Sequence, residues 1–332
     1  MSLKNSLKHL VFKLPENWIH HFYSIYNYCK FPDLRERRID GGDANPDSTV
    51  YIIRPRPGNV EGLMALYMDV VKQLSYAEKH GYIPVVDFQN YKTQYRDLSQ
   101  KTTKNVWEYY FAPVSLYSVD EAYCCKNIIL SGLNAIENCD EWLRQKYDEA
   151  SLKKTRALVR KYIHINSDIK KFVELEKSKI QFSPDTTLGL YLRGTDYIKL
   201  KPAGHPVQPS AEQAIEVADQ FLEKYHLSKV FLVTEDQEMY AAVKKHFAEK
   251  LTTVSFDSFI SGYNGKDFLS NNDDDINQLA ASQYERGLKY LCKEILLSEC
   301  KYFVGGNTSG SWAAHTLSNG YVDEYIFDLG KY

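Results

Sequence analysis

The sequence predicts an α/β protein in which parallel sheets are covered by helices. Short apolar runs with strand character alternate with helical patterns, in one series over residues 50–130 and in another over residues 187–327. This alternation is typical of parallel sheets, because a parallel connection needs a crossover helix. A polar stretch rich in Lys and Glu, residues 140–178, separates the two series. We therefore expect two Rossmann-like domains that face a cleft, residues 1–180 and 181–332.

In the first series, two prolines and a glycine after residue 54 end the first strand, because they cannot continue a ladder. Apolar residues at helical spacing follow, and a glycine at position 81 ends that helix. The expected elements are strands over 50–54, 82–88 and 126–130 and a helix over 60–79, followed by helices within 140–178. Residues 1–30 fit either a packed leader helix or a weak amphipathic segment that touches a membrane surface.

The second series contains five apolar runs of strand length, each followed or preceded by a helical pattern. Ser210 and Gln213 form a capping-box pattern at the start of one helix. The expected strands are 187–192, 229–233, 251–255, 301–304 and 324–327, and the expected helices are 210–225, 237–247, 276–298 and a last one that ends at 317.

Composition limits the class of protein. Of the 332 residues, 44% are hydrophobic and 25% are charged, which fits a chain with well-packed cores. The formal net charge of −2 gives no overall field that would attract nucleic acid. No apolar run approaches the roughly 18 residues of a membrane-spanning helix. The six cysteines lack metal-ligand spacing, so we expect free thiols in a reducing compartment, the cytoplasm.

One strand end in the second series is the first candidate for a binding site. The strand over 187–192 stops at Arg193, which is followed by Gly194 and by Thr195-Asp196. Ligands of open α/β sheets bind beyond the carboxyl ends of the strands. The guanidinium fork of arginine suits a phosphate or a diphosphate. A structural Arg–Asp pair that closes the loop explains the same residues, and the sequence alone leaves both interpretations open.

Two further loops follow strands and are expected at the same sheet edge. Gly305–Ser311 carries three glycines and three hydroxyl residues ahead of a helix, and the N–H groups of a helix start attract anions. A simple helix cap is the alternative. In Thr234-Glu235-Asp236, the carboxylates are candidates to bind a ribose or a base edge, and capping of the next helix is again the alternative. We expect the three loops to converge on one phosphate.

Other acidic residues are candidates for a base and for a metal site. Glu61 lies in the Gly58–Gly62 turn at a predicted helix start, where a carboxylate can act as a general base. Charge pairing with the helix N-terminus is the alternative. Asp273-Asp274-Asp275 offers clustered oxygen ligands, but its position ahead of a predicted helix favours charge capping. The chain lacks a Walker loop and a Gly-x-Gly-x-x-Gly fingerprint, which disfavours an NAD-binding protein.

Taken in order, these segments resemble motifs of the fucosyltransferase superfamily, which includes the bacterial and animal α-1,6-fucosyltransferases and the protein O-fucosyltransferases. Tyr191–Asp196 is similar to the family's His-x-Arg-Arg strand end, and His205-Pro206 matches a His-Pro pair that follows it. Phe231–Asp236 resembles a strand that ends in Thr-Asp-Asp. Tyr302–Ser309 looks like a strand with a Thr-Phe-Ser-Ser turn. The likeness covers residues 185–320.

The resemblance implies a GT-B-like fold in which the C-terminal domain holds most of a nucleotide sugar. Carried over by position, Arg193 would bind the donor diphosphate and support the leaving group. Thr308 and Ser309 would donate to phosphate oxygens, and Glu235 or Asp236 would contact the nucleoside. The remaining residues expected at the donor are Tyr191, His205, Thr234, Asn307 and Gly310.

The N-terminal domain is expected to be the acceptor side, and two residues are candidates for the base. The α-1,6 enzymes carry a Glu shortly after the first motif, and Lys201 stands there in this chain. Glu61 is therefore the first choice and Asp196 the second. A first loop such as Gly58-Asn59 contributes to catalysis in protein O-fucosyltransferases. Because Arg193 and backbone donors neutralise the diphosphate, no metal is required.

The sequence thus predicts an inverting, metal-independent glycosyltransferase that moves a sugar, first of all fucose from GDP-fucose, to a glycan or lipid-linked glycan hydroxyl. The nucleotide sugar is a co-substrate, and no cofactor and no nucleic-acid partner is expected. We expect a role in bacterial surface polysaccharide synthesis, with peripheral contact to the inner membrane face as an option. A nucleotide-sugar-binding protein without turnover is the alternative.

Overall fold

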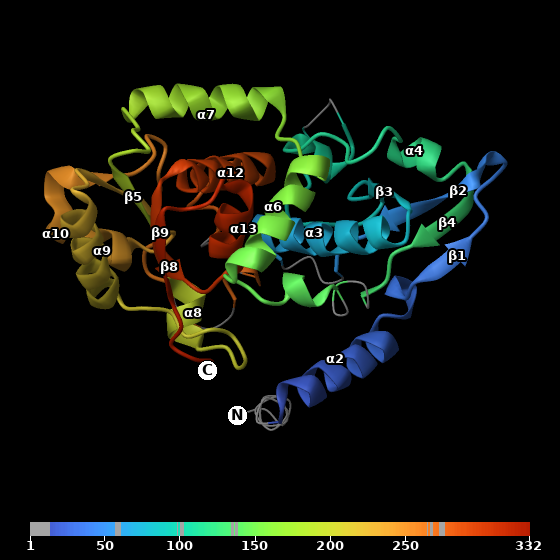
Figure 1. Ribbon diagram of the computed structural model, residues 1–332, viewed down its shortest axis with the longest axis horizontal. Coiled ribbons are helices and arrows are strands. Elements are labelled where there is room, and N and C mark those ends of the chain that lie inside the picture. The colour runs from blue at the N-terminus through green and yellow to red at the C-terminus, as the bar shows by residue number, and fades with distance from the viewer. Residues whose placement is uncertain are drawn as a thin grey trace. The chain divides into compact units, whose positions relative to one another are not determined.

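The computed structural model forms two compact units, Met1–Asn166 and Ser167–Tyr332 (Figure 1). The sequence led us to expect the domain boundary after residue 180. The structure divides the chain after Asn166, so helix α7 (Ser167–Lys179) belongs to the second unit. The structure describes residues 14–332 except 57–60, 98, 100–102, 134, 135, 137, 138, 264, 266, 267 and 272–275.

The first unit has a mixed four-stranded sheet of order β1-β4-β2-β3, in which β2 runs parallel to β3 and β4 and β1 is antiparallel to β4. Apolar side chains of β2, β3 and β4 form a core with α4. The elements are α2 (Glu16–Lys30), η1 (Pro32–Leu34), β1 (Arg37–Ile39), β2 (Ala44–Ile53), α3 (Leu63–Lys79), β3 (Ile83–Val86), η2 (Val106–Tyr109), α4 (Val119–Ala122), β4 (Cys125–Leu130), η3 (Glu141–Leu143) and α6 (Glu149–Tyr162).

The second unit has a five-stranded sheet of order β7-β6-β5-β8-β9, and every pair in it is parallel. The strand order reverses between β5 and β8, which makes this pair the topological switch point. The elements after α7 are β5 (Thr187–Tyr191), α8 (Thr195–Leu200), α9 (Ala211–Tyr225), β6 (Lys229–Val233), α10 (Gln237–Phe247), η4 (Ala248–Lys250), β7 (Leu251–Thr252), η5 (Leu269–Asn271), α12 (Gln283–Glu299), β8 (Tyr302–Gly306), α13 (Ser309–Leu317) and β9 (Asp323–Phe327).

The α/β class and the parallel sheets predicted from the sequence are confirmed, and so is the capping box of α9, formed by Ser210 and Gln213. Several element boundaries differ from the expected ones; β7, for example, ends at Thr252 instead of residue 255. The helix expected over 276–298 begins only at α12, because Ser282 caps it by accepting a hydrogen bond from Glu285 N. The strand expected from residue 50 begins earlier, at the start of β2.

The structure also bears on the cysteines, on membrane-spanning helices and on metal-binding side chains. All six cysteines are free thiols. Within the described residues, no helix has the length and the apolar character to cross a membrane. The described part of the chain also holds no group of three or more His, Cys, Asp or Glu side chains that could bind a metal ion. Asp273-Asp274-Asp275 lies outside the described residues.

Candidate functional site

The three loops that the sequence singled out follow three neighbouring strands of the second unit. Strand β5 pairs in parallel with β6 on one side and with β8 on the other. Parallel neighbours end at the same sheet edge, so the Arg193 loop, the Thr234–Asp236 loop and the Gly305–Ser311 loop share that edge. Two of them, those after β5 and β8, lie at the switch point, where ligands of such sheets bind.

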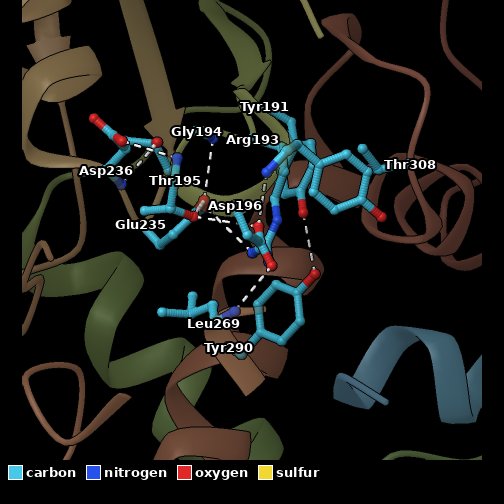
Figure 2. A network of polar contacts seen from close by, with 12 residues as sticks. Tyr191, Arg193, Gly194, Thr195, Asp196, Glu235, Asp236, Leu269, Tyr290 and Thr308 are labelled. Atoms are coloured by element: carbon cyan, nitrogen blue, oxygen red, sulfur yellow. Dashed lines mark hydrogen bonds and ion pairs between the residues drawn. The ribbon is translucent and has the colours of Figure 1, made fainter. Parts of the chain in front are cut away.

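Arg193 is held between two carboxylates (Figure 2). Its Nη2 donates to Asp196 Oδ1 at 3.2 Å, and its Nη1 lies 3.4 Å from Glu235 Oε2. The guanidinium carbon is 5.4 Å from the centre of the Tyr197 ring. The Arg193 side chain remains 24% exposed, whereas the Asp196 side chain is buried. The loop-closing pair that the sequence left open is therefore present, and part of the Arg193 side chain remains in contact with solvent.

The charge of Arg193 is stabilised by these neighbours. Burial disfavours the charged form, but Glu235 and Asp196 outweigh this effect and hold the pKa of Arg193 above its ordinary value. The two ion pairs that Arg193 makes with described residues both use its Nη atoms. An arginine has five N–H donors. Nε and one hydrogen of each Nη make no ion pair with a described residue and can donate to a further acceptor.

Glu235 and Asp236 fix the backbone that follows Arg193. Glu235 Oε1 accepts from Gly194 N at 3.1 Å and from Thr195 Oγ1 at 2.8 Å. Asp236 Oδ2 accepts from Thr195 N at 2.9 Å. Thr195 has a φ of 41°, in the left-handed region that residues other than glycine rarely adopt. These hydrogen bonds hold the chain in that conformation and set the direction from which Arg193 leaves the strand.

Asp236 also caps the next helix. Its Oδ1 accepts from the N–H groups of Glu238 and Met239 at 2.8 and 2.9 Å, in the first turn of α10. Thr234 Oγ1 accepts from Asp236 N at 3.2 Å. The helix-capping alternative for this loop is thus present in the structure. A nucleoside contact by Glu235 or Asp236 stays a prediction.

Gly194, which stands where the resembling family has a second arginine, has a packing reason to be glycine. A Cβ at this position would lie 2.3 Å from the Cβ of Asp236. No side chain fits there while Asp236 holds the loop. The departure from the family motif is therefore coupled to the way in which this chain closes the loop after β5.

Asp196, the second candidate for the base, lies in the first turn of α8 and is buried. Its Oδ1 accepts from Arg193 and from Tyr197 N, and its Oδ2 accepts from Leu269 N at 3.2 Å. Both oxygens are thus used to tie Arg193 and the η5 segment together. Its contacts are those of a residue that positions Arg193.

The loop after β8 leads directly into α13. Thr308 is the N-cap residue, and its Oγ1 accepts from Ser311 N at 3.3 Å. Ser309 is the first helical residue, so the N–H groups of the first turn face the end of β8, where a helix terminus favours an anion. The carbonyl of Asn307 accepts from Gln208 Nε2 at 3.5 Å. Thr308 and Gln208 thus both hold the backbone at the start of α13.

Tyr191 connects this helix start to the end of β5. A Cβ on Gly310 would lie 2.3 Å from Tyr191 Oη and 2.8 Å from Tyr290 Oη. The two hydroxyls are 3.1 Å apart (Figure 2). Tyr191 itself is buried, and burial raises the pKa of its hydroxyl. Tyr191 therefore packs under the first turn of α13, where it contacts α12 through Tyr290.

His205 belongs to an aromatic group beside Arg193. Its ring centre is 5.4 Å from that of Tyr197 and 5.9 Å from that of Phe268. Since Tyr197 also faces the Arg193 guanidinium, the group extends the site along one side. The sequence analysis did not include Tyr197, Phe268 or Gln208. The signal for Tyr197 was its place directly after Asp196, on the same short helix.

Glu61 lies in the first unit, two residues before the start of α3. Its Oε1 is 3.8 Å from Arg56 Nε, but Arg56 Nε donates to Asp69 Oδ2 at a shorter 2.7 Å. Burial, together with the negative charge of Asp69, raises the pKa of Glu61 to about 7 against the opposing charge of Arg56. Leu63 N, at the start of α3, donates to Tyr95 Oη. This N–H group of the helix start is therefore bonded to a tyrosine hydroxyl and not to the Glu61 carboxylate.

The structure thus gathers Tyr191, Arg193, Asp196 and the loops after β6 and β8 in the second unit, while Glu61 stands in the first. Gly58 and Asn59 of the first loop lie outside the described residues. Arg56 and Asp69 are neighbours of Glu61 that the sequence analysis missed. Their signal was the Arg-Pro-Arg-Pro run before the turn and an aspartate on an otherwise apolar helix face.

No model of a known protein family matches the sequence, and no curated protein is significantly similar to it. Among solved structures, the chain is similar to NodZ alpha-1,6-fucosyltransferase soaked with GDP-fucose, with 15% identity and a TM-score of 0.46 over 82% of this chain and 93% of that one. It is also similar to NodZ from Bradyrhizobium (14% identity, TM-score 0.46, 82% and 93% covered). POFUT1 in complex with GDP gives 11% identity and a TM-score of 0.47, with 86% and 99% covered.

Proposed function

We propose that this chain is an inverting, metal-independent glycosyltransferase that transfers a sugar from a nucleotide donor to a hydroxyl of a glycan acceptor. The donor of first choice is GDP-fucose, because the Arg193 loop, His205-Pro206 and the loops after β6 and β8 resemble the motifs of fucosyltransferases. The acceptor is a glycan or a lipid-linked glycan, and the product would serve a bacterial surface polysaccharide made at the cytoplasmic side of the membrane.

One observation carries this proposal, namely the position of Arg193 at the switch point beside the start of α13. A diphosphate placed there would accept hydrogen bonds from Arg193 and from the N–H groups that open α13. Asp196 and Glu235 would keep the guanidinium charged and oriented before the donor arrives. As the bond between sugar and diphosphate breaks, the same donors would stabilise the charge that develops on the leaving group.

Glu61 is the base of this proposal. A general base works best when its pKa lies near the working pH, and the raised pKa of Glu61, about 7, meets this condition. The carboxylate would take the proton of the acceptor hydroxyl, whose oxygen attacks the anomeric carbon while the diphosphate leaves from the opposite face. The anomeric configuration inverts in this single displacement.

The test is release of GDP from GDP-fucose in the presence of a panel of glycan acceptors. The Glu61→Gln variant should bind GDP with the affinity of the wild type and lose turnover by about 100-fold or more, because it cannot accept the proton. Glu78→Gln, an exposed change on α3, is the matched control and should retain turnover.

The outcome separates this proposal from its alternative. Wild-type protein that binds GDP-fucose tightly but releases no GDP with any acceptor would be a nucleotide-sugar-binding protein. Turnover that persists in Glu61→Gln would remove Glu61 as the base and leave the donor site untouched.

A further inference from the structure

Helix α2 carries an exposed apolar face that includes no residue of the proposed donor site and not the proposed base. The side chains of Trp18, Phe22, Ile25 and Tyr26, together called the α2 face, are between 45% and 57% exposed. Steps of four, three and one residues place the four side chains on one side of a helix. The Trp18 and Phe22 rings lie 6.5 Å apart, so the face is continuous. Apolar surface that is gathered in this way marks a binding surface.

The sequence segment that contains this helix has a net charge opposite in sign to that of the rest of the chain. Residues 1–38 contain seven Lys and Arg against three Asp and Glu, whereas the whole chain has a net charge of −2. Lys30, Arg37 and Arg38 are exposed. The Lys30 ammonium lies 5.1 Å from the centre of the Tyr26 ring, directly at the α2 face. A positive segment with an apolar face is complementary to a surface that is apolar inside and anionic outside.

The residue types narrow the partner further. Tryptophan and tyrosine have an apolar body and a polar tip and favour the interface between lipid headgroups and acyl chains. Basic residues beside an amphipathic helix add attraction to anionic lipids. A second copy of this chain fits less well, because a twofold contact would bring two positive segments together.

We propose that α2 binds the surface of an anionic lipid membrane, with the α2 face in the headgroup region and the basic residues of the segment next to lipid phosphates. This binding does not depend on the proposed transferase activity. If both hold, the membrane contact would bring the enzyme to a lipid-linked acceptor.

The experiment measures flotation of the full chain with vesicles of phosphatidylcholine and phosphatidylglycerol, and with vesicles of phosphatidylcholine alone. The wild type should bind the anionic vesicles. The double variant Trp18→Ser, Phe22→Ser should bind them at least about tenfold more weakly, because it removes two large apolar side chains from the interface. The matched control, Leu116→Ser with Leu175→Ser, changes two exposed leucines outside α2 and should bind as the wild type does.

A second arm tests the charges. Arg37→Gln with Arg38→Gln should weaken binding to the anionic vesicles and leave any binding to phosphatidylcholine alone unchanged. Thermal unfolding of each variant checks the fold independently of GDP binding. The proposal is wrong if the wild type does not float with anionic vesicles, or if the serine variant of α2 floats as well as the wild type. It is equally wrong if sedimentation equilibrium shows that the α2 face joins two copies and the vesicles stay bare.

Discussion

Glu61 illustrates how a residue suited to proton transfer lowers the stability of the fold. Its side chain is 18% exposed and lies beside Asp69. Asp69 accepts a 2.7 Å hydrogen bond from Arg56, so Arg56 stabilises the Glu61 carboxylate less. The pKa of Glu61 rises from an ordinary value of 4.5 to about 7 as a result. Ionising the group therefore favours the unfolded chain.

The consequence for stability has a defined sign. Between pH 4.5 and pH 7 the folded chain keeps the Glu61 proton and the unfolded chain releases it, so stability falls as pH rises through this window. At pH 8 the ionisation of Glu61 lowers the free energy of unfolding by about 3 kcal/mol. Glu61→Gln cannot ionise and should be more stable than the wild type by about 1 to 3 kcal/mol. Below pH 4 the two should unfold alike. Urea unfolding at both pH values measures this, and equal stability at pH 8 would contradict the assigned environment.

At the same scale, Arg193 and Asp236 mark what a sequence can and cannot tell. That Arg193 ends a buried strand was predictable from the apolar run and the abrupt change after it. Its pair with Asp196 was one of the two interpretations that the sequence left open. Its pair with Glu235 was not predictable, because Glu235 follows another strand and can reach Arg193 only through the parallel pairing of β5 with β6. Asp236 was predictable as a helix cap from its place before α10, while its bond to Thr195 N needed the fold.

Among the elements, α13 depends on a close approach that only glycine permits. Gly310 packs against the hydroxyls of Tyr191 and Tyr290, and Tyr191 is fixed by its place at the end of β5. Gly310→Ala should push the first turn of α13 away from β5 and lower stability by about 1 to 3 kcal/mol. If this turn holds a phosphate, the affinity for GDP should fall as well.

Gly62→Ala is the matched control for that change, since a Cβ at Gly62 meets no atom of the described residues within 4 Å. Thermal unfolding and calorimetric titration with GDP on both variants provide the comparison. Gly310→Ala with wild-type stability would show that the turn tolerates the extra carbon and that the packing against Tyr191 is not a constraint.

Element boundaries were predictable where local chemistry sets them. The β2 strand ends where Pro55 begins a run of breakers, and α9 starts at its capping box. The antiparallel strand β1 and the early start of β2 were missed, because their residues are exposed and lack the apolar alternation that identifies a strand. Pairing with β4 decides their conformation, and pairing is a property of the fold.

For the whole molecule, the two units have separate sheets and separate cores. All residues that this account assigns to the donor lie in residues 167–332. We expect a fragment of residues 167–332 to fold, to bind GDP with an affinity close to that of the full chain, and to lack turnover. Circular dichroism checks its fold and calorimetry its affinity. A folded fragment that does not bind GDP would show that the first unit contributes to the donor site.

In the proposed function, Arg193 clamps a donor diphosphate as well as closing its loop. Calorimetric titration of GDP into the wild type, Arg193→Ala and Asp196→Asn separates these two roles. Asp196→Asn breaks the loop-closing ion pair but retains the guanidinium and an oxygen that can accept from it, so it should lose much less affinity for GDP than Arg193→Ala. Arg193→Ala should bind about 30-fold more weakly or worse, because a charged hydrogen-bond donor is lost. Undiminished affinity in Arg193→Ala, or equal losses in both variants, would contradict the claim.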